Sequence, residues 1–232
     1  VYNFKSPRQP IALELPAGQA VKFQTMLHQT WQTTLKQLER RFTAETYHNR
    51  IEAIRQQTGD VQQQALIELT QEGEELDLKL ISRNDEHCFI PVQYVDDKVL
   101  EMTQADINAL SSKERSEINA NIRHMDKKLE RLGMHLGDLE EDARDKVQVL
   151  NRDIAKQVLL PKVEQLLTKF AEVEGLKDYL KYYAEDIINN VEVVLEQEED
   201  DFTPGLFSRI PSRYQANVIV SHKPNAGAPV IF

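Results

Sequence analysis

The chain has little cysteine, little glycine and no long hydrophobic run. Its single cysteine, Cys88, excludes an intrachain disulfide framework and fits a reducing compartment. Only eight glycines occur in 232 residues, and this composition favours long helices over loops. No apolar run approaches the roughly 20 residues that a membrane-spanning helix needs. We therefore expect a cytoplasmic protein with no membrane partner.

The chain also lacks net positive charge. The formal net charge is −10, whereas binding to nucleic acid needs clustered lysine and arginine to neutralise phosphates. Local basic pairs such as Arg40 and Arg41 lie beside acidic residues such as Glu39. We expect no nucleic-acid partner.

Motifs for nucleotide, metal and nucleophile chemistry are missing as well. The sequence has no G-x-x-x-x-G-K-[ST] loop and no Gly-Lys pair. His124 and His135 fall on one expected helix about 16 Å apart, too far to share an ion. Ser221-His222-Lys223 lacks a nucleophile elbow, and the acidic run 196–201 lacks the glycine and spacing of a calcium loop. We assign this segment no catalytic, cofactor-binding or metal-ligating residue.

Helical periodicity is what the chain has in abundance. From Gly18 the apolar residues recur every three or four positions, which predicts a helix with one buried face. Thr43 is a plausible N-cap for a second helix that reaches about Gln71, and Gly59 predicts a break or kink within it. The first apolar stripe consists of Phe23, Met26, Leu27, Trp31, Leu35, Leu38 and Phe42.

Near Gly73 the hydrophobic period shifts to two. Two β-prone runs follow, separated by polar turns at 83–86 and 96–97. This pattern predicts a small β-hairpin or three-stranded meander over residues 76–102. Pro91 cannot donate a ladder hydrogen bond, so we expect its strand at an edge.

A long helix is predicted to begin at a capping box formed by Ser111 and Glu114. Up to Leu160 it would span about 70 Å, and Pro161 should kink or restart it. Its heptad seam, which predicts coiled-coil packing, could pair with another chain or fold back on the helices over 18–71. We favour folding back, because those helices carry apolar stripes that nothing else covers. The seam consists of Ile118, Ile122, Met125, Leu129, Leu132, Leu136, Leu139 and Ala143.

Both chain ends read differently from the middle. Residues 1–16 and 201–232 are strand-like or linker segments, and residues 17–200 are helical. The chain starts at Val1 without an initiator Met and ends at Phe232 in an apolar stretch, so we expect a segment of a larger protein. The expected fold class is mainly α: long antiparallel helices with coiled-coil packing, a β-hairpin at a tip and short strands at both chain ends.

The two ends also resemble a known family. Residues 1–18, VYNFKSPRQPIALELPAG, resemble the segment Y-N-F-x-x-P-x-x-P-x-x-L-x-L-P-A-G of bacterial Lon-related AAA+ proteases. Residues 213–220 and 227–230 resemble that family's R-Y-x-V-N-V-x-V and G-A-P-V, with Ala216 in place of a valine. In the middle, Phe89-Ile90-Pro91 and residues 102–110 fit the family's hairpin and the turn that follows it.

This resemblance implies that the chain is a helical insertion in an ATPase module, with a strand of the AAA+ core at each end. The parent would be an ATP-dependent Ser-Lys endopeptidase that uses ATP and magnesium and forms a homo-oligomeric ring. Its partners would be unfolded or damaged proteins and the remaining AAA+ and protease domains. The family's catalytic motifs lie outside this chain. Some Lon-like proteins have degenerate nucleotide sites, and both kinds of parent are compatible with this segment.

For function, the sequence favours substrate handling or gating during degradation of unfolded proteins. An edge strand can recruit an extended chain through its backbone, which makes Phe89, Ile90, Val92 and Tyr94 the candidate substrate contacts. Two alternatives remain: a structural coiled-coil spacer or oligomerisation module, and a holdase-type chaperone arm. A spacer should lack affinity for unfolded chains.

Overall fold

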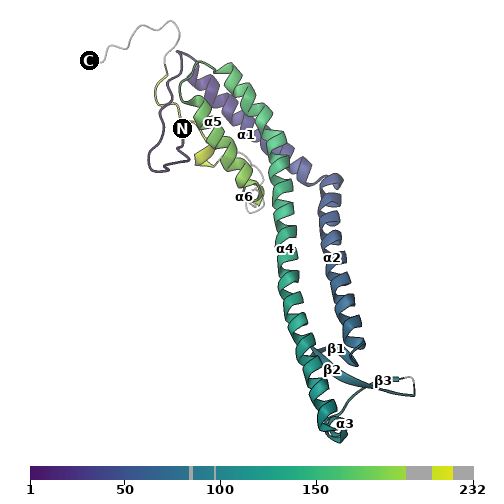
Figure 1. Ribbon diagram of the computed structural model, residues 1–232. Coiled ribbons are helices and arrows are strands. Elements are labelled where there is room, and N and C mark those ends of the chain that lie inside the picture. Colours follow the sequence, from purple (N-terminus) through teal and green to yellow (C-terminus); the bar gives the residue numbers. More distant parts are fainter. Residues whose placement is uncertain (84–85, 97, 197–210, 222–232) are drawn as a thin grey trace, which may run out of the picture. The chain divides into compact units, whose positions relative to one another are not determined.

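The computed structural model describes residues 1–83, 86–96, 98–196 and 211–221. The expected mainly α fold with one small sheet is confirmed (Figure 1). The elements, in chain order, are α1 (Ala20–Phe42), α2 (Glu45–Glu74), β1 (Leu78–Arg83), β2 (Glu86–Val95), β3 (Lys98–Glu101), α3 (Gln104–Ala109), α4 (Ser112–Lys169), α5 (Leu176–Asn189), α6 (Val191–Glu196) and the 3₁₀ turn η1 (Ser212–Tyr214).

The chain divides into two compact units. The first unit combines Val1–Asn49 with Gln148–Phe232, and the second unit is Arg50–Val147. Helices α2 and α4 therefore each contribute residues to both units. Each unit has its own cluster of buried apolar side chains.

The core of the first unit forms where α1, the end of α4, α5 and α6 pack together. The stripe expected on α1 is largely buried, and full burial of a large apolar side chain stabilises by about 1.5–3 kcal/mol. Gly175 precedes α5 with φ 74°, a left-handed conformation that side-chain-bearing residues rarely adopt. The most deeply buried members include Leu27, Leu38, Leu159, Leu166, Leu176, Tyr179, Leu180, Tyr183, Ile187 and Tyr214.

The junction of α1 and α2 corrects one expectation. Thr43 does not cap α2, which begins at Glu45. Instead Thr43 ends α1: its backbone N–H and its hydroxyl both donate to the carbonyl of Glu39, at 2.9 and 2.8 Å. A threonine hydroxyl readily bonds back to the carbonyl four residues earlier. In this chain the hydroxyl makes that bond and does not cap α2.

In the second unit, α2 and α4 lie side by side with the sheet at one end (Figure 1). Met125 on the predicted seam is fully buried in a cluster with Leu69, Leu78 and Phe89. Lys128 on α4 donates to the carboxylate of Glu72 on α2 at 2.6 Å. The seam thus packs on α2 and the sheet within one chain, as expected.

Two predicted helix breaks are wrong, whereas a kink at either position stays a prediction. Gly59 lies inside a continuous α2, because a single glycine costs a helix only about 1 kcal/mol. Pro161 lies inside a continuous α4. The proline removes the bond to the carbonyl of Gln157, and on either side of it Leu159 and Val163 are buried in the core. Tertiary packing therefore compensates for the bond that proline removes.

The capping box at the start of α4 is confirmed. The Ser111 backbone N–H donates to Glu114 Oε2 at 2.8 Å, and the Glu114 N–H donates to Ser111 Oγ at 3.2 Å. Hydrogen bonding to the side chain of Ser111 and to its backbone N–H lowers the pKa of the Glu114 carboxyl. A second capping box, between Thr103 and Asp106, opens α3.

The predicted meander forms as an antiparallel sheet in the order β1-β2-β3. The edge position expected for Pro91 is wrong, since β2 is the central strand. Pro91 lies where β2 changes partner: pairing with β1 ends at Leu78 opposite Pro91, and pairing with β3 begins at Val92 opposite Glu101. The N–H that Pro91 lacks therefore lies at the point where one strand ladder ends and the other begins. Because neither ladder needs that donor, the central strand tolerates the proline.

The strands expected at the chain ends do not form in residues 1–16 or 211–221. A strand needs a neighbouring strand, and residues 1–16 bond among themselves instead. The backbone nitrogen of Val1 donates to the Ile11 carbonyl at 2.9 Å, and Asn3 Oδ1 accepts from the N–H groups of Lys5 and Ser6. Assignment of these ends to an AAA+ core stays a prediction. The acidic run 197–201 and the turn expected at 224–227 lie outside the described residues.

Candidate functional site

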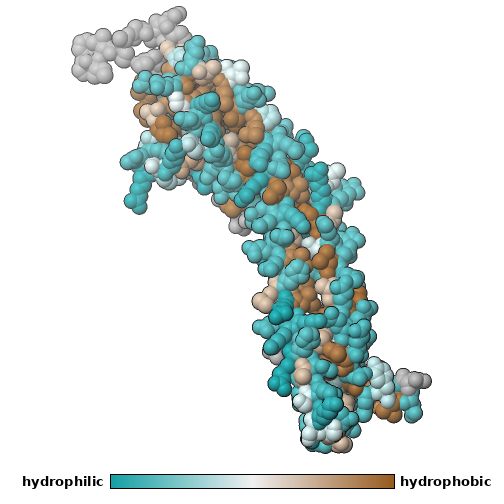
Figure 2. Space-filling view, in the orientation of Figure 1, coloured by the Kyte–Doolittle hydropathy of each residue, from teal (hydrophilic) through white to brown (hydrophobic). Residues whose placement is uncertain are grey.

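The end of the β2–β3 ladder exposes four large apolar side chains, Tyr94, Val95, Val99 and Leu100, which we call the apolar tip. Their exposed fractions are 58, 43, 48 and 45%. Tyr94 lies directly opposite Val99 in the ladder, and such cross-strand pairs share one face of a sheet. All four residues of β3 are exposed. Figure 2 shows hydrophobic surface here, at the end of the sheet.

The four predicted substrate contacts differ in how far they are exposed. Phe89 and Val92 are buried, with 3% and 5% of their surface exposed. Ile90 is half-buried, and Tyr94 is the exposed member. Substrate contact therefore stays a hypothesis centred on Tyr94.

Sequence reasoning had not placed Val95, Val99 and Leu100 beside Tyr94 as candidates. The signal was present in the short β-prone run that follows the turn at 96–97. Its antiparallel pairing with the end of β2 brings these side chains to the same end of the sheet as Tyr94.

The second unit also contains a groove of about 650 Å³ between α2, β2 and α4, which we call the acidic groove. Its lining is mostly apolar and comes from the heptad seam and one leucine of α2. The lining residues are Leu66, His87, Cys88, Asp126, Leu129, Glu130, Leu132, Gly133 and Leu136.

The charged residues that line this groove are both acidic. Asp126 and Glu130 stand one helical turn apart on α4 and both line it. Neither carboxylate takes part in an ion pair within the described part of the chain. No lysine or arginine is among the lining residues. The groove thus joins an apolar floor to two uncompensated negative charges.

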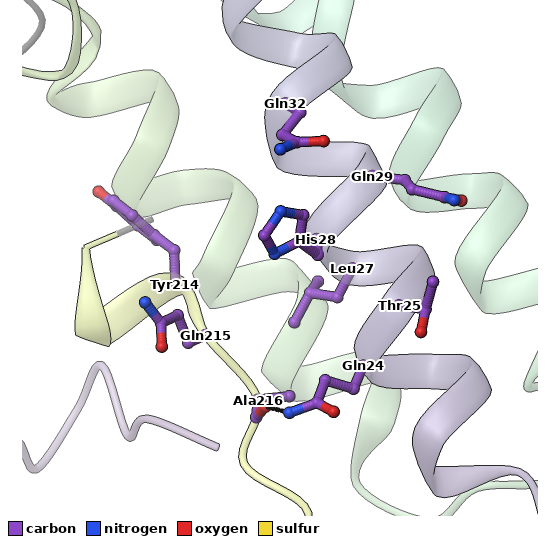
Figure 3. Close-up of a pocket in the computed structure, with 9 residues that line it drawn as sticks. All are labelled: Gln24, Thr25, Leu27, His28, Gln29, Gln32, Tyr214, Gln215 and Ala216. Atoms are coloured by element: carbon purple, nitrogen blue, oxygen red, sulfur yellow. Dashed lines mark hydrogen bonds between the residues drawn. The ribbon is translucent and has the colours of Figure 1, made fainter. Parts of the chain in front are cut away.

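The first unit has a polar pocket of about 380 Å³ between α1 and residues 214–216 (Figure 3). Its lining includes four glutamines, together with Thr25 and His28. Gln24 Nε2 donates to the Ala216 carbonyl at 2.7 Å and fastens the extended segment to α1. No carboxylate, lysine or cysteine lines the pocket, and the groups that it offers are mainly the amides of its glutamines.

Tyr214 anchors that extended segment in the core. Its ring stacks on Trp31 with centroids 4.5 Å apart, and its hydroxyl donates to Asp186 Oδ2 at 2.6 Å. Burial raises the pKa of Tyr214, and likewise that of Tyr179 and Tyr183. These phenols therefore stay protonated near neutral pH.

The sequence lacks a phosphate-binding loop, and within residues 1–83, 86–96, 98–196 and 211–221 no three His, Cys, Asp or Glu side chains come together as metal ligands. Of the Ser221-His222-Lys223 run, the last two residues lie outside the described residues. Across the same described stretches, no helix combines the length and the apolar run that crossing a membrane requires.

Comparison with protein-family models finds a match to part of the chain. Residues 1–30 match the family model of the Lon-like LonC helical domain. No curated protein and no solved structure matches the chain. The matched stretch includes Phe4, whose ring lies 6.2 Å from that of Tyr214, and the buried Phe23 and Leu27 of α1. Over these residues, the chain is similar to a helical domain of a Lon-like protein.

Proposed function

We propose that this chain is a non-catalytic helical segment of a Lon-like protease and that its apolar tip contacts unfolded polypeptide. The observation that carries the proposal is the cluster of four exposed apolar side chains at the β2–β3 end. The similarity of residues 1–30 to the Lon-like LonC helical domain supports the family context.

The chemistry of the tip suits a substrate without fixed sequence. As an edge strand, β3 has one side free of ladder partners, and an unpaired edge accepts an extended chain through backbone hydrogen bonds. The exposed side chains of Tyr94 and Val99 add apolar contact on one face, with little demand for particular residues. Unfolded proteins present both features, an extended backbone and exposed apolar groups.

Within this proposal the parent is a cytoplasmic, ring-forming, ATP-dependent Ser-Lys endopeptidase. ATP and magnesium bind elsewhere in that parent, and this segment delivers or gates the substrate. The cleavage chemistry belongs to the protease domain, so loss of the tip impairs the degradation of unfolded proteins more than that of short peptides.

The test is a double variant, Tyr94→Ser with Val99→Ser, assayed for binding to unfolded casein by fluorescence anisotropy. We expect the affinity of the 232-residue chain to fall about tenfold, because two apolar anchors are lost. The matched control is Val61→Ser with Val149→Ser, two valines that are also exposed, at 43 and 55%. The control should bind like the unmodified chain.

The alternatives give other results. A structural spacer would show no affinity for casein even in the unmodified chain. A holdase arm would bind casein through the tip, yet the tip variant of the parent would still degrade unfolded protein at the normal rate. Equal loss of casein and short-peptide cleavage in the parent would indicate a role in ring assembly.

A further inference from the structure

We propose that the acidic groove is a docking site for an amphipathic helix of a partner protein, with an apolar stripe flanked by lysine or arginine. The site goes beyond the proposed function, because it shares no residue with the apolar tip. Three features of the second unit support it.

The first feature is an incompletely covered heptad seam. Leu129, Leu132 and Leu136 hold regular seam positions, yet all three are only half-buried. On the α2 side of the groove, Leu66 still exposes 39% of its surface. Two helices leave this stretch of seam open, and the apolar face of a third helix would cover it in the usual helix-in-groove manner.

The second feature is Gly133, a glycine in the interior of α4 that lines the groove. Glycine destabilises a helix interior relative to alanine, and apart from its chain neighbours and the backbone of α4 itself, a Cβ at Gly133 would meet no described atom within 4 Å. Internal packing therefore does not explain the glycine. A bare Cα on the groove wall allows a docked helix to approach the α4 backbone closely, as small residues do at helix–helix contacts.

The third feature is charge. Asp126 and Glu130 project one turn apart beside the apolar lining and have no ion-pair partner among the residues that the structure describes. A partner that carries lysine or arginine beside its apolar stripe would place positive charge against them. Such complementarity selects a basic helix over an acidic one and speeds association.

Cys88 provides a built-in reporter for the test. It is the only cysteine of the chain, lines the groove and is partly exposed. The probe is a fluorescent peptide of about 16 residues with leucine at helical spacing and flanking lysines, compared with the same peptide carrying flanking glutamates. We expect saturable binding of the lysine peptide, slower alkylation of Cys88 in its presence, and affinity that falls as salt is raised.

Gly133→Leu is the decisive variant, because leucine favours the helix more than glycine does and would fill the groove. We expect the variant to be at least as stable as the unmodified chain and to lose about tenfold or more in affinity for the lysine peptide. The matched control is Gly59→Leu, at another helical glycine of the second unit with no atom near its would-be Cβ and no place in the groove. The control should bind the peptide normally.

The charge argument has its own pair of variants. Asp126→Asn with Glu130→Gln should weaken the lysine peptide about fivefold at low salt and leave little difference at high salt. Asp138→Asn with Glu140→Gln removes two exposed carboxylates of α4 outside the groove and should have no such effect.

Several outcomes would overturn the proposal. They are a lysine peptide that does not slow Cys88 alkylation, equal binding by the Gly133→Leu chain, and equal affinity for the glutamate peptide. A concentration-dependent dimer that protects Cys88 without peptide would assign the groove to a second copy of the chain. Normal peptide binding by the Tyr94→Ser/Val99→Ser chain is expected, and it makes failure at the groove distinguishable from failure at the apolar tip.

Discussion

The ring of Phe89 lies so close to Gly73 that a Cβ on residue 73 would overlap the ring edge. Gly73 belongs to the last turn of α2 and Phe89 to β2, so this contact joins helix to sheet in the second unit. The contact explains why Phe89 is buried and why it is a core residue in this chain. It also makes Gly73 a position where any side chain must displace its neighbour.

Replacing Gly73 by alanine should therefore destabilise the chain. We expect a loss of about 1–3 kcal/mol in the free energy of unfolding, the usual cost of overpacking. Gly133→Ala, at a helical glycine with open space around it, should instead stabilise by about 0.5–1 kcal/mol, since alanine is the better helix former. Urea unfolding of both variants checks the pair, and equal effects would show that the Phe89 contact is not formed in solution.

The folded-back seam is tested with two methionines of α4. Met125 is fully buried against Leu69 and Leu78, whereas Met134 is 61% exposed. Met125→Asp should cost more than about 3 kcal/mol, because it buries a charge without a partner. Met134→Asp should stay within about 0.5 kcal/mol of the unmodified chain. If sedimentation instead showed a dimer that Met125→Asp converts to a folded monomer, the seam would be intermolecular.

Two buried tyrosines of the first unit should respond in opposite directions to loss of the hydroxyl. The Tyr183 hydroxyl is buried with no hydrogen-bond partner in the described structure, so Tyr183→Phe should stabilise by up to about 1 kcal/mol. The Tyr214 hydroxyl donates to Asp186, so Tyr214→Phe should destabilise by about 1–2 kcal/mol. Thermal unfolding followed by circular dichroism measures both variants. A destabilised Tyr183→Phe chain would show that the Tyr183 hydroxyl has a hydrogen-bond partner.

Alkaline pH should weaken the first unit. Burial raises the pKa of Tyr179, Tyr183 and Tyr214, whereas tyrosines of the unfolded chain ionise near pH 10. The folded state therefore keeps these protons above about pH 10, and the contribution of the three tyrosines to the free energy of unfolding should be constant below that pH and fall as pH rises further. Urea unfolding at about pH 8 and about pH 11 measures the loss, and a smaller loss is expected for Tyr183→Phe.

Local pattern was enough to predict much of the fold. The stripe on α1, the capping box of Ser111 and Glu114, the meander and the seam through Met125 all depend on residues close in sequence and on the periods of helix and strand. The resemblance carried by residues 1–18 likewise depends on sequence alone, and the family match over residues 1–30 overlaps it. Each of these features depends on residues that lie close together in the sequence.

Tertiary structure decided the remaining features, because they depend on which neighbours compensate for a local cost. Pro161 remains helical because the residues around it are packed in the core, and Pro91 fits a central strand because the ladder changes partner there. Phe89 and Tyr94 belong to one β-prone run, yet the first meets Gly73 and the second meets solvent. Hydrophobicity alone predicted both as surface contacts, and only the packing of α2 against the sheet distinguishes the core residue from the exposed one.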